Sequence, residues 1–237
     1  MSLPKEISPN PLIISSIEVR FISDLDEANV LGTFFPVFSK ELEKLSTGKI
    51  PSKIRKVQEH LKYFPDYTLS NNKYSVSFSN KAILFENVGE YTFWDNYFDF
   101  VKKQLTKLFS LKIIKKIERI GVRYASILKQ EENLNNILKH YPVFSINGFD
   151  EQLVLIRTDL KKNKNNLHLQ IARNAKTELN GIVKNGLLID IDASNSNIIE
   201  QDDEIVFKII DELHSDEKSL FFELLTPTYL SKLNPKY

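Results

Sequence analysis

The run from Lys115 to Lys129, KKIERIGVRYASILK, constrains the fold most, because it is the longest β-like stretch and lies near the middle of the 237-residue chain. Side chains of a strand alternate between its two faces. The two faces are predicted to hold Glu118, Ile120, Val122 and Tyr124 on one side and Ile117, Arg119, Gly121 and Arg123 on the other. The first face is expected to be buried. The second presents two guanidinium groups beside a glycine, which marks a bulge or a close approach to the backbone.

Two similar halves meet at this strand. Residues 1–129 predict the order β-α-β-β-α-β, with a strongly amphipathic helix from Thr92 to Ser110. Residues 130–237 predict the order β-β-β-α and end in a long helix from about Asp202 to Leu225. We expect an α+β fold of two related antiparallel or mixed β-sheet modules, each backed by a long amphipathic helix and packed as one unit. Strands from the ends and the middle of the chain are expected to be neighbours.

Composition excludes several classes of site. The chain has no cysteine, which rules out disulfides, thiolate metal sites and cysteine nucleophiles. Its four histidines, at positions 60, 140, 168 and 214, do not fall at a metal-ligand spacing. The seven glycines form no phosphate-binding loop, dinucleotide-binding turn or nucleophile elbow. Since these motifs are missing, we expect no cofactor. There is also no long apolar run and no apolar leader, so we expect a cytoplasmic protein.

The sequence LLIDID, which ends at Asp192, carries the strongest candidate chemistry. As a strand it directs its aliphatic residues into the core and sets Asp190 and Asp192 side by side on the other face. Two carboxylates so placed can share a divalent cation. The favoured interpretation is that they pair across the sheet with Arg119, Arg123 or Arg157. The predicted polar sheet face comprises Arg20, Arg119, Arg123, Arg157, His168, Asp190 and Asp192.

The formal charge of +1 conceals an asymmetry. Residues 1–129 hold 20 of the 32 basic and 14 of the 31 acidic residues, a net charge of +6, which leaves −5 for the remainder. Halves of opposite sign favour packing against each other or head-to-tail association into a homo-oligomer.

The densest basic group lies in the segment 46–72, which is expected to be a long connection around a short helix from Lys53 to Tyr63. This group consists of Lys49, Lys53, Arg55, Lys56 and Lys62. Three aromatic residues lie beside it, and basic groups next to aromatics suit single-stranded nucleic acid. The alternative is a loop that its aromatic side chains pin to the core.

Four short motifs carry a resemblance that spans nearly the whole chain. They are Pro11-Leu12 followed by IEVRF at 17–21, RIGVRY at 119–124, LLIDID at 187–192, and a closing helix with Leu213-His214 and FFELL at 221–225. In these motifs the chain resembles a sporadically distributed family of uncharacterised prokaryotic α+β proteins. Such a distribution implies genes that move horizontally, as in mobile or defence cassettes. The resemblance implies no enzymatic activity and no catalytic residue.

These observations favour a non-enzymatic protein-binding or assembly module that presents the polar sheet face to a protein partner. The alternative is a nucleic-acid-binding or metal-dependent phosphodiesterase-like protein, in which Asp190 and Asp192 would hold the metal.

Overall fold

The computed structural model describes residues 3–48, 50–131, 133–140, 154–179 and 182–237. These residues form two compact units, and each unit is built from separate stretches of the chain. Unit 1 comprises Met1–Ile14, Arg123–Ala193 and His214–Tyr237. Unit 2 comprises Ser15–Val122 and Ser194–Leu213. The division falls inside three strands, β1, β6 and β9, and inside the longest helix, α4.

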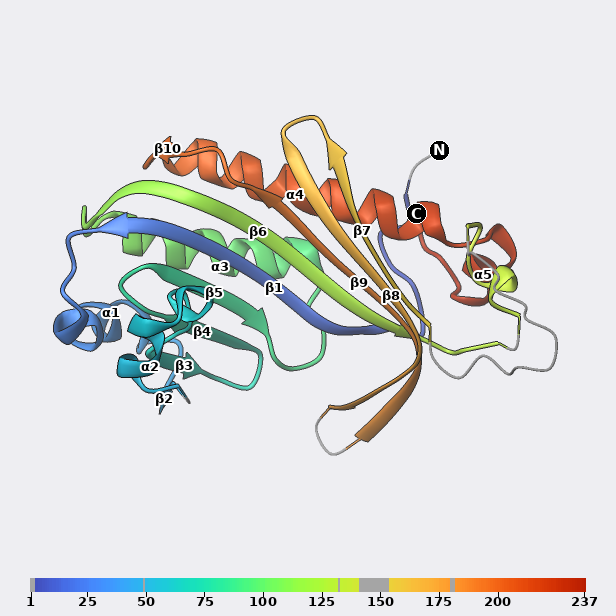
Figure 1. Cartoon of the computed structure of the whole chain (residues 1–237), viewed down its shortest axis with the longest axis horizontal. Helices are drawn as coiled ribbons and strands as arrows, with labels where there is room; N and C mark the ends of the chain where they lie inside the picture. Colours follow the sequence, from blue (N-terminus) through green and yellow to red (C-terminus); the bar gives the residue numbers. More distant parts are fainter. Residues whose placement is uncertain (1–2, 49, 132, 141–153, 180–181) are drawn as a thin grey trace. The chain divides into compact units, whose positions relative to one another are not determined.

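The strands are β1 (Leu12–Ser23), β2 (Lys44–Thr47), β3 (Tyr67–Ser70), β4 (Tyr74–Phe78), β5 (Ala82–Asn87), β6 (Ile114–Leu128), β7 (Leu155–Lys162), β8 (Asn165–Leu179), β9 (Ile182–Asn195) and β10 (Ile199–Glu200). The helices are α1 (Val30–Phe38), α2 (Ser52–Val57), α3 (Trp94–Phe109), α4 (Asp203–Leu224) and α5 (Pro227–Lys232). Helices and a large antiparallel sheet together confirm the α+β class (Figure 1).

One ten-stranded sheet replaces the two sheet modules that the sequence suggested. Its hydrogen-bonded order is β2-β3-β4-β5-β1-β6-β9-β8-β7, and β10 pairs with β6 beside this path. The physical reason is that β1, from the start of the chain, pairs with β5 and lies next to β6, which is followed in turn by β9 from the other half. Strands from the end and the middle of the chain are therefore neighbours, as expected.

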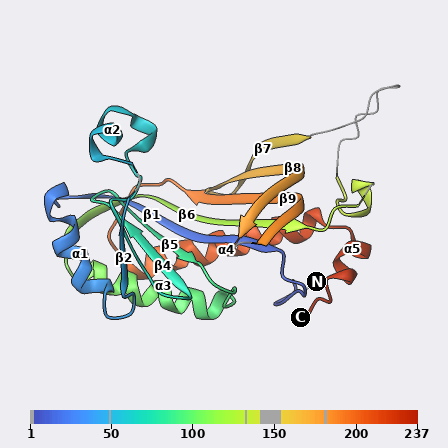
Figure 2. The same cartoon turned by 90° about the horizontal axis from the view of Figure 1, so that it is seen from below.

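The core of unit 2 lies between its strands and helices α1 and α3. In β1, Ile17, Val19 and Phe21 are buried, and they alternate with the more exposed Glu18 and Arg20. Helix α3 buries a stripe of residues at helical spacing, namely Tyr97, Phe100, Val101, Leu105 and Leu108. Helix α3 lies on one face of the strands of unit 2 and α2 on the other (Figure 2).

Helix α1 contains both Gly32 and Pro36, and Asp26 caps the 3₁₀ turn that leads into this helix. One expectation for unit 2 needs correction. The segment 46–72 also contributes β3 as well as α2. Strands as short as β2 and β3 are held by cross-strand hydrogen bonds to each other and to β4, which no local sequence pattern reveals.

Strict alternation fails within β6. Ile117 and Ile120 are both buried although they are three residues apart, while Glu118 and Arg119 between them are partly exposed. This corrects the prediction that placed Glu118 on the buried face and Ile117 on the polar face. The shift has the character of a β-bulge, which directs two consecutive residues of one strand to the same side. Ile117 lies opposite Ile199 of β10 in the sheet.

The core of unit 1 lies between the sheet and the second part of α4. Leu167, Leu169 and Ile171 of β8 are buried, as are Leu187, Ile189 and Ile191 of β9. Helix α4 lies on one face of β8 and β9 (Figure 2), and Asn165 of β8 donates a hydrogen bond to Asp216 of this helix over 2.8 Å. The residues that alternate with the buried set therefore lie on the face directed away from α4.

Thr226 caps α5, because its hydroxyl accepts a hydrogen bond from the backbone amide of Tyr229, and Pro227 begins the helix. Residues Leu134–Asn136 form a short 3₁₀ turn. After this turn, Leu138 forms an isolated antiparallel β-bridge with Leu225. No helix in the described part of the chain is both long and apolar enough to cross a membrane.

Candidate binding surface

The side of the unit 1 sheet directed away from α4 is polar, and we call it the outer face. It consists of Arg123 of β6, Arg157 and Asp159 of β7, His168 and Gln170 of β8, and Asp190 and Asp192 of β9. Five of the seven predicted site residues belong to it: Arg123, Arg157, His168, Asp190 and Asp192. The alternation predicted for β8 and β9 is confirmed by the burial of their intervening aliphatic residues.

Arg123 and Asp190 form the central contact of the outer face. Nε of Arg123 donates to Oδ1 of Asp190 over 2.9 Å, and Nη2 donates to Oδ2 over 2.7 Å. Such a two-point pair fixes both planar groups against each other. The Arg123 side chain remains 46% exposed, whereas that of Asp190 is only 15% exposed. Arg123 is therefore positioned by the sheet and still accessible to a partner.

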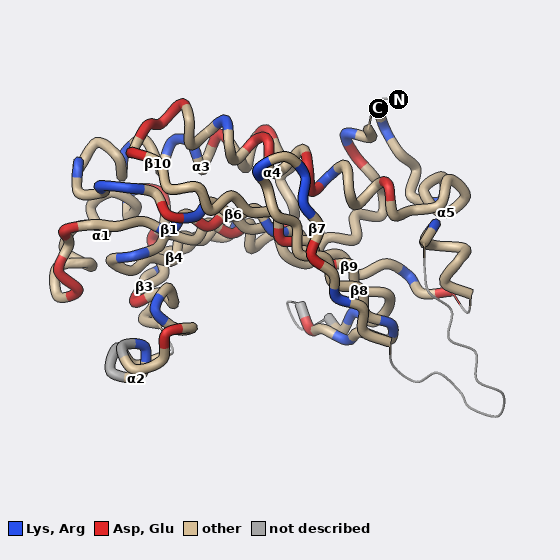
Figure 3. The backbone as a smooth tube through the Cα atoms, turned by 45° about the horizontal axis from the view of Figure 1, so that its top comes forward, with Lys and Arg blue, Asp and Glu red and all other residues tan. Residues whose placement is uncertain are grey.

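Two further contacts connect β7 to β8. Arg157 lies opposite Gln170, and its Nε donates to the amide oxygen of Gln170 over 3.0 Å. Asp159 lies opposite His168, and its Oδ1 is 2.6 Å from Nδ1 of the imidazole. All four side chains stand on one face because the residues are two apart on each strand. Basic and acidic positions accordingly interleave along β7 (Figure 3).

The arrangement around Asp190 bears on the metal hypothesis. Both of its carboxylate oxygens accept hydrogen bonds from Arg123, so the cross-strand pair that the sequence favoured is present. A cation shared with Asp192 would have to displace that guanidinium. Among the residues that the structure describes, no three His, Cys, Asp or Glu side chains come together as a metal-binding group.

The other two predicted site residues, Arg20 and Arg119, belong to unit 2. Oε2 of Glu18 accepts from Nε of Arg20 over 2.8 Å and from Nη1 of Arg119 over 2.7 Å. Arg119 also lies across Gly121, where an added β-carbon would be 2.3 Å from Nη1. The close approach that the sequence indicated at Gly121 is thus made by the side chain two residues before it.

Tyr63 covers this group of charges. The guanidinium carbon of Arg20 lies 4.3 Å from the centre of the Tyr63 ring, and the Tyr63 hydroxyl donates to Glu118 over 3.4 Å. The sequence prediction assigned no site role to Glu18, although its alternation with buried Ile17 and Val19 was an available signal. Tyr63 was one of the three aromatic residues noted beside the basic group, but nothing local indicated its contacts with Arg20 and Glu118.

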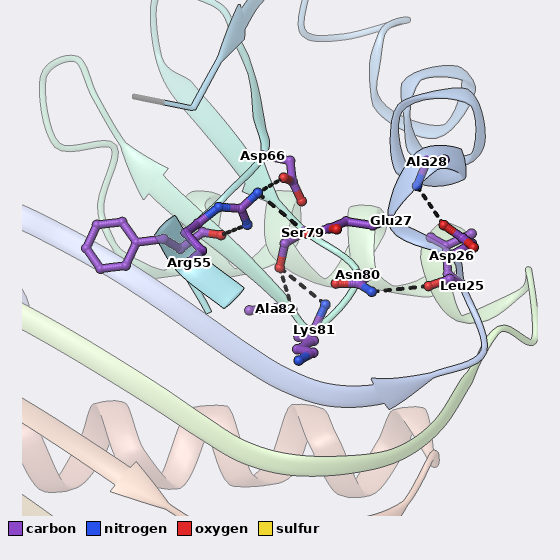
Figure 4. A network of polar contacts seen from close by, with 11 residues as sticks. Leu25, Asp26, Glu27, Ala28, Arg55, Asp66, Ser79, Asn80, Lys81 and Ala82 are labelled. Carbon is purple, nitrogen blue, oxygen red and sulfur yellow. Dashed lines mark hydrogen bonds and ion pairs between the residues drawn. The ribbon is translucent and has the colours of Figure 1, made fainter. Parts of the chain in front are cut away.

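Arg55 is buried, contrary to its prediction as part of an exposed basic patch. Its side chain is only 6% exposed and pairs with Asp66, and its Nη1 donates to the carbonyl of Phe64 over 2.9 Å. Glu27 lies 3.9 Å from the same guanidinium. Figure 4 shows the Arg55 guanidinium directed toward Asp66 with Glu27 nearby. Arg55 therefore joins α2 to the start of β3 and is not presented to a ligand.

The remaining members of the basic patch give little support to a nucleic-acid interface. The side chain of Lys62 pairs with Glu59, and its ammonium group lies 4.9 Å from the centre of the Tyr63 ring. Lys49 and the side chains of Lys53 and Lys56 lie outside the described residues. The contacts of Tyr63 and Arg55 match the alternative interpretation, in which the loop is pinned by its own side chains.

The burial of two titratable groups of α4, His214 and Glu217, was not predicted from the sequence. Burial lowers the pKa of His214 to about 3, with a further contribution from the positive charge of Lys218. Burial raises the pKa of Glu217 well above its usual range, against the opposing effect of Lys218. Glu217 falls in the helical series that also buries Leu213 and Phe221, and this spacing was a usable signal of its burial.

In comparisons with known proteins, no family model and no curated protein matches the sequence.

Proposed function

We propose that this chain is a non-enzymatic binding module whose outer face recognises a protein surface of mixed charge. The Arg123–Asp190 pair carries the proposal, because it holds an accessible guanidinium in a defined orientation on a sheet. Pre-positioned charged groups lose less conformational freedom on binding than free ones, and they select partners by charge complementarity. Arginine is also enriched in the energetically important parts of protein interfaces.

A protein partner fits the charges better than a nucleic acid does. Asp159, Asp190 and Asp192 are interleaved with Arg123 and Arg157 on the outer face. Surfaces that bind nucleic acid are dominated by positive charge, because affinity comes largely from contacts with phosphates. Three carboxylates on the same surface oppose a polyanion and complement a partner that carries both signs.

The test places a photo-crosslinking residue on the outer face at His168, and at Ser215 in α4 as a matched exposed position in the same unit. In cells that express the protein, we expect one recurrent protein adduct from position 168 and none from position 215. The double variant Arg123→Asp with Asp190→Arg keeps an ion pair in the sheet but reverses its direction. It should retain the wild-type melting temperature and lose the adduct.

Equal crosslinking from both positions, or an adduct that survives the reversal, would reject the outer face as the recognition surface. Fluorescence anisotropy with single-stranded and double-stranded oligonucleotides tests the alternative. Oligonucleotide binding that weakens steeply as salt is added would indicate that the ligand is nucleic acid and not a protein.

A further inference from the structure

Strand β7 is an edge strand of the described sheet. In the part of the chain that the structure describes, β7 has only β8 as a hydrogen-bonded neighbour. It is eight residues long, and Leu155 and Leu160 are 47% and 39% exposed. The strand at the other end, β2, has four residues. A long edge strand with exposed aliphatic residues is a template for pairing with another strand, whereas a short one is protected against it.

The β7–β8 register determines which backbone groups of β7 are available. The carbonyl of Val154 accepts from the amide of Arg173 over 2.9 Å, and Thr158 lies opposite Leu169. Hydrogen-bonded and non-hydrogen-bonded pairs alternate in an antiparallel ladder, so the even-numbered residues of β7 face β8. The amide and carbonyl groups of the odd-numbered residues point away from the sheet, and these residues are Leu155, Arg157, Asp159 and Lys161.

We propose that β7 pairs with β7 of a second copy of this chain, antiparallel about a two-fold axis through Thr158. Arg157 then lies opposite Asp159 of the second copy, and Asp159 lies opposite Arg157 of the second copy. Ile156 meets Leu160 of the second copy on the other side of the strand. The inference goes beyond the function proposed above, since it rests on the edge of β7 and on neither Arg123 nor Asp190.

The charges of β7 select this register from the alternatives. Only odd-numbered residues can bond across the new edge, so the axis of a symmetric pair must pass through a residue. An axis through Arg157 sets two guanidinium groups opposite each other, and an axis through Asp159 does the same with two carboxylates. Like charges directly opposite on a ladder are destabilising, whereas opposite charges are stabilising. An axis through Thr158 gives two Arg–Asp pairs, and an axis through Leu160 shortens the paired stretch.

The present contacts of Arg157 and Asp159 are compatible with new ion pairs across this edge. Arg157 already donates its Nε to Gln170 and keeps its Nη groups for another acceptor. Asp159 contacts His168 through Oδ1, and its side chain is still 86% exposed. The second copy would complete a row from Gln170 through Arg157 to the Asp159 and His168 of that copy.

Sedimentation equilibrium across a concentration series from micromolar to near-millimolar tests the proposal. The wild type should associate into a dimer. Arg157→Asp and Asp159→Arg should each weaken the dimer by about tenfold or more, because each sets like charges opposite one another. An equimolar mixture of the two variants should dimerise again, and so should the double variant Arg157→Asp with Asp159→Arg. Lys176→Asp, an exposed change of charge on β8, should leave the dimer unchanged.

Circular dichroism checks that each variant folds. If the charge variants do not fold, Asp159→Pro replaces them, since it removes an amide that points away from β8 and leaves the β7–β8 hydrogen bonds in place. A wild type that stays monomeric throughout the series would overturn the proposal. A dimer that tolerates Asp159→Arg or Asp159→Pro, or a mixture that does not reassociate, would overturn it as well.

Discussion

The guanidinium of Arg119 lies over the bare backbone of Gly121, so that an added β-carbon would be 2.3 Å from Nη1 and 2.9 Å from Cζ. The same Nη1 donates to Glu18 of β1 over 2.7 Å. Glycine at this position therefore leaves the space through which a β6 arginine reaches a carboxylate on β1.

Gly121→Ala should displace the Arg119 guanidinium and weaken its pair with Glu18. We expect the substitution to cost about 1 kcal/mol more of unfolding free energy in the wild type than in an Arg119→Ala background. Urea unfolding followed by the fluorescence of Trp94, the one tryptophan of the sequence, measures all four members of this cycle. Equal costs in both backgrounds would show that the two residues are not coupled.

Gly186→Ala provides the contrasting case in unit 1. A β-carbon at residue 186 would be 2.1 Å from the carbonyl oxygen of Leu128, and backbone cannot swing aside as the end of an arginine side chain can. The substitution should therefore destabilise the protein by about 2 kcal/mol. Thermal unfolding by circular dichroism measures the change, and a melting temperature equal to that of the wild type would contradict it.

His214 should make the protein less stable in mild acid. Its folded pKa of about 3 lies below the ordinary histidine value of 6.5, so the unfolded chain takes up a proton that the folded chain does not. Stability is then lost as pH falls below 6.5. Relative to His214→Gln, the wild type should lose about 2 kcal/mol between about pH 7.5 and about pH 5. Urea unfolding at both pH values measures this, and parallel pH profiles would reject it.

Glu217 should act in the opposite direction. Burial raises its pKa well above the ordinary glutamate value of 4.5, so the folded chain keeps a proton that the unfolded chain releases. The stability contributed by this proton is complete below pH 4.5 and is lost as pH rises toward the folded pKa. Glu217→Gln should therefore gain stability relative to the wild type as pH rises from about 4 to about 8. A difference that does not depend on pH would argue against a buried, protonated Glu217.

Arg55 should matter for stability far more than its neighbour Lys62. Arg55→Leu leaves Asp66 buried without its guanidinium partner, and breaking a buried pair costs about 3 kcal/mol or more. Lys62→Ala removes a pair with the exposed Glu59 and should cost about 0.5 kcal/mol or less. Trp94 fluorescence during urea unfolding compares the two variants. Similar losses would mean that the Arg55 contacts are not structural.

The sequence predicted local features well where a single strand or helix carries the information. The alternation in β8 and β9 separated His168, Asp190 and Asp192 from the buried residues beside them, and this separation is confirmed. The predicted helices became α3 and α4 with bounds that differ by a few residues. Prediction failed where a non-local partner decides the outcome, as for β3 or for the shift of alternation in β6 next to Ile199.

Among the site residues, charge alone could not identify which cations are accessible. Arg55 and Arg123 both looked like surface residues, yet Arg55 is buried against Asp66 and Arg123 stands half exposed on Asp190. The desolvation of a guanidinium depends on the groups that the rest of the chain places around it. The residues next to it in the sequence do not indicate what those groups are.

The sequence by itself determined the α+β class, the positions of helices α3 and α4, and the face to which each residue of β8 and β9 points, because side-chain periodicity is a local property of the backbone. Only the tertiary structure decided that the strands join into one sheet, that Arg123 meets Asp190 and that β7 is left at an edge. Those outcomes depend on pairing between segments far apart in the chain, and their free energy comes from contacts that exist only after the segments meet.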